Sequence, residues 1–173
     1  SQVLMRADNE LLMTYHLGGG GGSDRKAGAK WLEPMFGQLD PRQLLVCPGA
    51  QAAIAASILT LTKPGAVILA EPMTYPGLRT AATQFGRHII TVQADKHGMR
   101  PDMLEQACRQ HKPGLIYLNP TLQNPTAITM PERRRKELAS IARRCNVRIV
   151  EDDPYWLLAD SPPPPIALSL IHI

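Results

Sequence analysis

The sequence predicts an α/β fold with a mostly parallel central sheet and helices on both faces. Short apolar runs alternate with helical patterns between residues 43 and 150, and only short turns separate them. Such alternation is typical of βαβ units. The last apolar run, 147–150, ends abruptly in Glu151, Asp152 and Asp153. A buried parallel strand looks like this when it delivers polar groups to the carboxyl edge of a sheet, where ligands bind.

The elements follow from periodicity and turn residues. Residues 24–39 carry apolar side chains at helical spacing, and Pro34 predicts a kink or a break there. Strands are predicted over 43–47, 66–70, 87–92, 115–118 and 147–150. Helices are predicted over 50–61, 75–85, 101–110 and 131–145, and a turn over 95–98.

Composition places the chain among ordinary globular proteins. Its 173 residues, with 44% hydrophobic and 20% charged residues, suit one domain or part of a larger protein. No apolar run approaches membrane-spanning length. The basic cluster 133–136 lies in an amphipathic helical pattern and is interpreted as a solvated helix face rather than a nucleic-acid patch. Cys47, Cys108 and Cys145 have no metal-ligand spacing, so we expect buried thiols in a reducing cytoplasm.

Two common nucleotide-binding motifs are excluded. The glycine run 18–22 predicts a flexible segment and not a dinucleotide fingerprint, because Ser23 stands where the last glycine belongs and no strand precedes the run. A GxxxxGK[ST] phosphate loop occurs nowhere in the sequence.

Two of the four segments that follow predicted strands contain residues suited to a phosphate or a ring. In the segment 47–51, Gly49 permits a tight turn and the next amides point out of a helix N-terminus, which suits either a phosphate or an ordinary capped turn. In the segment 71–77, Tyr75 lies next to Pro76 and close to Pro72. Its ring is either a stacking platform or a core aromatic.

The other two segments offer polar groups. The segment 119–126 contains two Asn-Pro pairs, which indicate a constrained backbone that could include a cis bond. Asn124 could donate to a ligand oxygen or bond its own backbone. Asp152 and Tyr155 are three residues apart just beyond a strand, so both could reach one small ring. A magnesium site is the poorer interpretation because no phosphate-binding lysine motif accompanies the carboxylates.

In this order, the four segments resemble the large domain of class I (fold-type I) pyridoxal-phosphate-dependent aminotransferases. The matching motifs are Pro48–Gln51, Pro72–Gly77, Leu122–Thr126 and Glu151–Tyr155. The segment Thr129–Arg135 is similar in particular to the aminotransferase-like domain of the MocR subgroup of GntR-type transcriptional regulators. The resemblance covers about residues 15–165.

The resemblance implies a pyridoxal 5′-phosphate site. The positions that it assigns to the cofactor are Gly49, Ala50, Gln51, Tyr75, Asn124, Asp152 and Tyr155. The first three would lie at the phosphate, Tyr75 would stack on the ring, and Asn124 and Tyr155 would bond its phenolic oxygen. Asp152 would pair with the ring nitrogen and favour its protonated form, which is the better electron sink.

The resemblance also implies partners. The whole protein would transfer an amino group between an amino acid and a 2-oxo acid, and it would form a homodimer in which Tyr15 reaches the phosphate of the other subunit. DNA binding would require an upstream winged-helix domain, as in a regulator that uses this domain to sense an effector. An unrelated α/β nucleotide-binding domain is the third alternative, disfavoured by the missing motifs.

The sequence departs from the family pattern at several positions. A hydroxyl residue is usual near the phosphate turn, where this chain has Cys47, Pro48 and Ala50, and a glycine often stands at the position of Ala127. No lysine stands in the motif of the Schiff-base lysine, so we name no catalytic residue. We expect residues 1–173 to be a partial large domain that lacks this lysine and the small C-terminal domain, and that is inactive alone.

Overall fold

The structure, a computed structural model, describes residues 18–170 and the side chains of residues 18–168. The chain divides into two compact units, Ser1–Cys47 and Pro48–Ile173. Tyr15, expected near a partner's phosphate, lies outside the described residues.

The first unit contains the helix α3 (Gly22–Phe36) and the short 3₁₀ helix η1 (Pro41–Gln43). Helix α3 runs through Pro34 and ends two residues later, so the expected break is displaced to the helix end. There Gly37 adopts φ 72° and donates its N–H to the carbonyl of Glu33 at 2.8 Å. Glycine is the residue that best tolerates this left-handed backbone.

The strand predicted over 43–47 is wrong. The backbone is extended at Leu44, but residues 44–47 join no sheet. The amide of Val46 donates to the carbonyl of Gly19 at 2.7 Å, which is an isolated bond and not a ladder. Leu45 and Val46 are 74% and 51% exposed. The sequence pattern predicted an extended backbone correctly. A strand also needs another strand to pair with, and sequence periodicity does not reveal whether one is present.

The second unit confirms the predicted α/β fold. Its sheet has the order β2-β1-β5-β6, and all neighbouring strands are parallel. The strands are β1 (Val67–Ala70), β2 (His88–Thr91), β5 (Leu115–Leu118) and β6 (Arg148–Glu151). The helices are α4 (Ala50–Leu61), α5 (Pro76–Gln84), α6 (Pro101–His111) and α7 (Glu132–Arg144), with 3₁₀ turns η2 (Trp156–Leu158) and η3 (Ile166–Leu170). The predicted turn 95–98 lies in an antiparallel hairpin of β3 (Ala94–Asp95) and β4 (Gly98–Met99).

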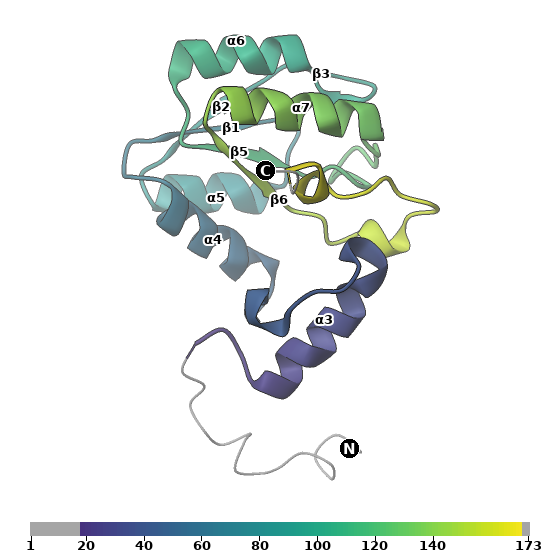
Figure 1. The fold of residues 1–173 in the computed structure, drawn as a ribbon. Helices are drawn as coiled ribbons and strands as arrows, with labels where there is room; N and C mark the ends of the chain where they lie inside the picture. Colours follow the sequence, from purple (N-terminus) through teal and green to yellow (C-terminus); the bar gives the residue numbers. More distant parts are fainter. Residues whose placement is uncertain (1–17, 171–173) are drawn as a thin grey trace. The chain divides into compact units, whose positions relative to one another are not determined.

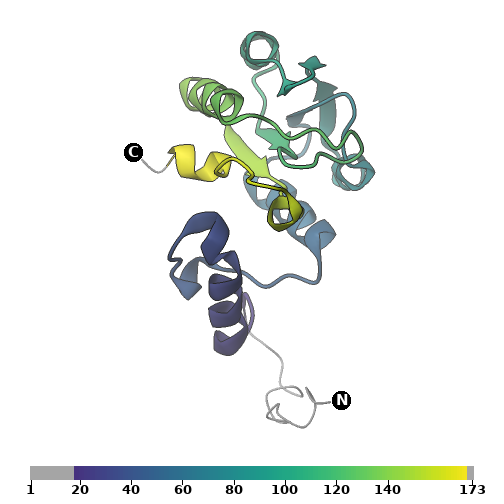
Figure 2. The same cartoon turned by 90° about the vertical axis from the view of Figure 1, so that its right-hand side faces the viewer.

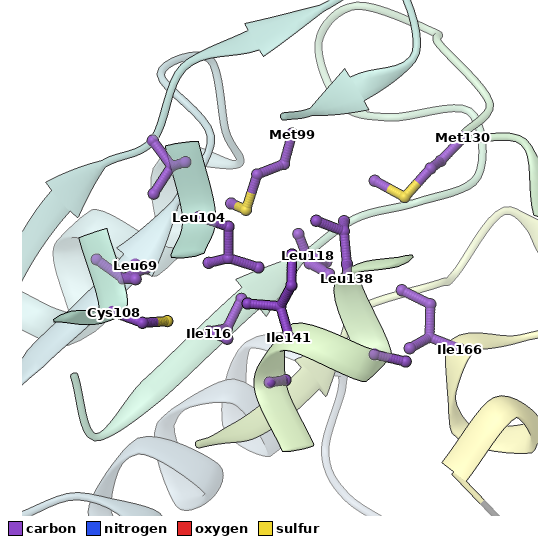
Figure 3. Packing of buried hydrophobic residues seen from close by; sticks show 13 residues of the cluster. Leu69, Met99, Leu104, Cys108, Ile116, Leu118, Met130, Leu138, Ile141 and Ile166 are labelled. Carbon is purple, nitrogen blue, oxygen red and sulfur yellow. The ribbon is translucent and has the colours of Figure 1, made fainter. Parts of the chain in front are cut away.

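Helices cover both faces of this sheet, α6 and α7 on one and α4 and α5 on the other (Figure 1). In Figure 2, α6 and α7 are seen nearly end-on. The alternation of side chains along the strands explains the two layers. Leu69 of β1 and Ile116 of β5 point to the α6–α7 face, and Figure 3 shows them packed with Leu104, Leu138 and other residues. Their neighbours Ile68 and Leu115 pack against α4 and α5 on the other face.

The C-terminal segment of the unit returns to this core. Ile166, in η3, is 1% exposed and packs in the α6–α7 layer (Figure 3). The carboxylate of Glu151 accepts hydrogen bonds from the amides of Ile166 at 2.8 Å and Ala167 at 3.1 Å. The end of β6 is thereby fixed to the segment that follows it.

The cysteines differ in exposure. Cys108 is buried and Cys145 is partly buried, as expected for core thiols, but Cys47 is exposed, so the prediction of a buried thiol is wrong there. The same unpaired segment that left Leu45 and Val46 exposed accounts for this. Within residues 18–170, no helix is both long and apolar enough to cross a membrane.

Candidate functional site

Three of the predicted segments begin where three adjacent strands end. Glu71 follows β1, Asn119 follows β5 and Asp152 follows β6. The order β1-β5-β6 makes these strands neighbours, and all three are parallel. Their carboxyl ends therefore meet at one edge of the sheet, which is the ligand-binding edge of open α/β folds.

Asp152 is held at both its side chain and its main chain. The hydroxyl of Tyr117 in β5 donates to Oδ2 of Asp152, and the side-chain amide of Asn119 donates to its carbonyl oxygen. Burial raises the pKa of the Asp152 carboxyl, and the hydrogen bond from Tyr117 partly offsets this shift. Among residues 18–168, no cationic side chain lies within ion-pair distance of Asp152. A partly buried carboxylate in this state favours a cationic or hydrogen-bonding ligand.

Asn119 joins the loop that carries Asn124 to the end of β6. Its side-chain oxygen accepts from the amide of Asn124 at 2.6 Å, while its nitrogen donates to the carbonyl of Asp152. Asn119 is 3% exposed, so the side chain that makes both bonds is buried. The Asn124–Pro125 peptide bond is cis, as the Asn-Pro pairs suggested. The structure thus brings Asn124 and Asp152 together through one buried side chain.

The same loop is tied to the segment after β1. The side-chain amide of Gln123 donates to the carbonyl of Met73, and its oxygen accepts from the amide of Thr126 at 2.9 Å. Tyr75, two residues beyond Met73, is partly buried and packs against the layer that contains Tyr117. Tyr75 therefore lies near Tyr117, whose hydroxyl donates to the Asp152 carboxylate.

The turn before α4 has free donors. Gly49 adopts φ 88° and precedes the helix without a side-chain cap, and the first turn of α4 carries no acidic residue. The first amides of a helix have no intrahelical partner, so those around Ala50 and Gln51 are available to an anion. All three residues are exposed. The predicted phosphate turn precedes a helix as expected, although it follows an extended segment instead of a strand.

The side chain of Gln51 connects this turn to the Tyr75 segment. Its Nε2 donates to the carbonyl of Gly77 at 3.0 Å. A Cβ at Gly77 would lie 2.2 Å from Oε1 of Gln51 and 2.3 Å from Cε1 of Tyr75. Only glycine permits this approach, so Gly77 is the residue that lets Gln51 and Tyr75 meet.

Tyr155 directly precedes η2 and lies three residues beyond Asp152. It is partly buried. Its carbonyl accepts from the amide of Leu158 at 2.9 Å. Within the described part of the chain its hydroxyl has no hydrogen-bond partner, so it is free to bind a ligand.

Arg135 is a residue whose role the sequence interpretation missed. The cluster 133–136 was expected to be a solvated helix face, and Arg133 is indeed 91% exposed, but the Arg135 side chain is 0% exposed. Arg135 donates to the carbonyls of Met130 at 3.0 Å and Pro120 at 3.1 Å. Its burial could have been found from spacing, because Arg135 stands three residues before Leu138, on the apolar face of α7.

Arg135 and Asp153 form a buried charged group beneath the site. Arg135 lies 3.8 Å from both Asp153 and Glu151, and its guanidinium bonds the hydroxyl of Thr121 at 2.9 Å. That hydroxyl donates to Oδ2 of Asp153 at 2.8 Å. Burial raises the pKa of Asp153 to about 6, and Oδ1 of Asp153 has no partner among the described residues. This group links the Asn-Pro loop to the end of β6.

Within residues 48–168, no lysine forms an ion pair with Asp152. Lys63 and Lys112 precede strands, and Lys96 lies in the turn between β3 and β4. Lys136 is on α7 and pairs with Glu132. None of these four lies within ion-pair distance of the Asp152 carboxylate.

The match to a family model, "Aminotransferase class I and II", spans residues 7–170. An uncharacterized HTH-type transcriptional regulator of Bacillus subtilis, YdeF, is 36% identical over 134 residues, which are 75% of this chain and 29% of the relative. The mitochondrial kynurenine/alpha-aminoadipate aminotransferase of Mus musculus is 33% identical over 141 residues, which are 75% of this chain and 32% of the relative. The chain therefore spans about a third of these relatives' length.

Solved structures agree. An archaeal alanine:glyoxylate aminotransferase is 30% identical with a TM-score of 0.78, covering 87% of this chain and 38% of that one. The alpha-aminoadipate aminotransferase of Thermus thermophilus, solved with N-(5′-phosphopyridoxyl)-L-leucine, is 26% identical with a TM-score of 0.86, covering 99% of this chain and 43% of that one. The family match, the relatives and the parallel sheet with its polar carboxyl edge show together that the chain belongs to the class I and II aminotransferases, a pyridoxal-phosphate-dependent family.

Proposed function

We propose that this chain supplies the cofactor-binding part of an aminotransferase, and that the whole protein transfers an amino group between an amino acid and a 2-oxo acid. The observation that carries the proposal is the pair of hydrogen bonds at the Asn119 side chain, one donated to Asp152 and one accepted from Asn124, which brings these two residues together at the sheet edge. Family membership gives this geometry its chemical meaning.

The donor set fits pyridoxal 5′-phosphate. The free amides at Gly49, Ala50 and Gln51 suit a phosphate, since α4 offers them no side-chain cap. Asp152 is a partly buried carboxylate without a cationic partner in residues 18–168, which suits a protonated ring nitrogen. When bound, the cofactor supplies an electron sink for the substrate.

The remaining positions orient the ring. We propose that Tyr75 stacks on it and that Asn124 and Tyr155 bond its phenolic oxygen. The partial burial of Tyr75 and the free hydroxyl of Tyr155 within the described residues support these roles. Asp152 holds the proton at the ring nitrogen, and Tyr117 and Asn119 fix Asp152 in place.

Binding of pyridoxamine 5′-phosphate tests the proposal, because this form of the cofactor makes no covalent bond with surface lysines. Equilibrium dialysis with the 173-residue chain should give weak binding, with a dissociation constant on the order of 0.1 mM, since a covalent link is absent. Asp152→Asn should weaken binding about tenfold, because a neutral amide no longer stabilises the pyridinium. The exposed Asp102→Asn is the control. Equal binding by both variants would refute the assignment of Asp152.

A second candidate is an effector-sensing domain of a transcriptional regulator of the MocR type. It rests on the 36% identity to the Bacillus subtilis HTH-type regulator. Such a protein would bind the same cofactor without a requirement for turnover, and it would bind DNA through another domain. A DNA-binding assay on the whole protein with and without pyridoxal 5′-phosphate separates the two candidates, because only a regulator responds.

We also propose that the whole protein is a homodimer in the cytoplasm. The free thiols of Cys108 and Cys145 in the core support a reducing compartment. Sedimentation of the whole protein tests the dimer.

A further inference from the structure

A separate cavity lies behind the Asn-Pro loop. It has a volume of about 250 Å³ and lies between the segment after β1, the β3–β4 hairpin and residues 119–130. Its buried lining residues are Glu71, Gly98, Asn119, Pro120, Gln123 and Met130. None of the seven cofactor positions lines it. The cavity therefore adjoins the site at Asp152 through Asn119 without including any of those positions.

A buried carboxylate faces this cavity. Glu71 is 6% exposed and lines the wall. Gly98 makes room for it, because a Cβ there would lie 3.1 Å from Oε1 of Glu71 and 2.9 Å from Cε of Met130. Gly98 also has φ 88°, a backbone conformation that other residues adopt at a cost. The hairpin glycine thus lets the backbone approach the carboxylate closely.

The lining is acidic and apolar, with no basic side chain. Besides Glu71 it contains Asp95, which is paired with Arg134 at 3.0 Å. Within residues 18–168, Glu71 has no cation at ion-pair distance. The side chains of Met73, Ile128 and Met130 supply apolar surface. A carboxylate at the wall of an apolar cavity loses much of its hydration, and a cation with a hydrocarbon body would stabilise its ionised form.

We propose that this cavity binds a small aliphatic amine in its ammonium form, with Glu71 as the counter-ion and Met73, Ile128 and Met130 in contact with the hydrocarbon. Amino acids and 2-oxo acids are disfavoured, because the wall has no cationic group for their carboxylate. The inference does not depend on the proposed function.

Occupancy of the cavity would reach the cofactor edge through shared residues. Asn119 lines the cavity and also bonds Asn124 and Asp152. Gln123 lines it and donates to the carbonyl of Met73. The ligand would therefore contact the side chains that position the Asn-Pro loop.

Ligand-observed NMR with n-butylammonium chloride tests the proposal on the 173-residue chain. Binding should saturate below about 50 mM, as for a fragment of a few atoms, whereas n-butyrate at the same concentration should not bind. Glu71→Gln keeps the shape of the side chain and should weaken binding about tenfold. The control Glu132→Gln changes an exposed carboxylate on α7 and should have no effect.

A second variant tests the cavity volume and leaves the charge of Glu71 unchanged. Ala94→Phe adds bulk at the rim of the cavity from an exposed position and should abolish binding while the thermal midpoint stays within a few degrees. Absence of saturation for the unchanged chain, equal binding of butyrate, or unchanged affinity in a folded Glu71→Gln variant would each overturn the proposal. Failure of cofactor binding at Asp152 would leave it standing.

Discussion

The hydroxyl of Tyr117 donates a hydrogen bond to Oδ2 of Asp152 across the β5–β6 strand pair. The bond lowers the pKa of a carboxyl that burial raises. It also orients the carboxylate and favours its charged form, which a pyridinium partner requires. Tyr117 is 1% exposed, so the donor of this bond is held inside the sheet layer.

Tyr117→Phe should raise the pKa of Asp152, because the donor to the ionised form is lost. Binding of pyridoxamine 5′-phosphate should then require a higher pH than in the unchanged chain, and the shift of the binding midpoint is the measurement. Tyr155→Phe is the control, since it removes a proposed ligand contact but no bond to Asp152. It should weaken binding at every pH without moving the midpoint. Equal midpoints for Tyr117→Phe and the unchanged chain would contradict this account.

Asn119→Ala should destabilise the second unit by about 1–3 kcal/mol, because it leaves the amide of Asn124 and the carbonyl of Asp152 without their partner. Urea unfolding measures the free energy. The control Gln106→Ala removes an exposed amide side chain from α6 and should change stability by less than about 0.5 kcal/mol. Asn119→Asp retains the acceptor for Asn124 but sets an oxygen against the carbonyl of Asp152, so it should lose at least as much stability as Asn119→Ala. A neutral result for Asn119→Ala would show that water satisfies both groups.

Local patterns predicted most of the fold. Strand β5 was predicted with its observed bounds, and the helices α4 to α7 within about two residues, because short strands and helices of one layer are marked by periodicity and by Pro or Gly turns. The segment 43–47 failed for a nonlocal reason, since its extended backbone has no partner edge.

The site was predictable in part for the same reason. Residues such as Asp152 and Asn124 stand in motifs that follow strands, so their order along the chain pointed to them. Tyr117 and Asn119 act through partners 35 and 5 residues away, and nothing in the local sequence announces those partners. Arg135 looked like one charge in a basic run, and only the side-chain spacing on α7 distinguishes it from Arg133.

Arg135→Met should destabilise the second unit by about 3–5 kcal/mol, because it leaves Asp153 and Glu151 as buried charges without a cation. Adding Asp153→Asn should recover part of the loss, since one of those charges is then removed. Denaturant unfolding of the two single variants and the double variant gives the coupling free energy. Arg133→Met, at a 91% exposed side chain, is the matched control and should be nearly neutral. Strict additivity of Arg135→Met and Asp153→Asn would show that the two side chains do not interact.

The pH dependence of stability should reveal Glu71. Burial raises the pKa of its carboxyl to about 7 from an ordinary value of 4.5. The folded state therefore binds a proton that the unfolded state releases between these values, so stability falls as the pH rises from about 4.5 through 7.

Glu71→Gln removes the ionisation. It should match the unchanged chain near pH 4.5 and exceed it at about pH 8 by on the order of 2–3 kcal/mol. Thermal unfolding at both pH values measures the difference. Burial also raises the pKa of Asp153 to about 6, so its ionisation lowers stability over a lower pH range. The Glu71→Gln variant retains this decrease. A constant difference between the two chains at all pH values would mean that Glu71 does not titrate in this window.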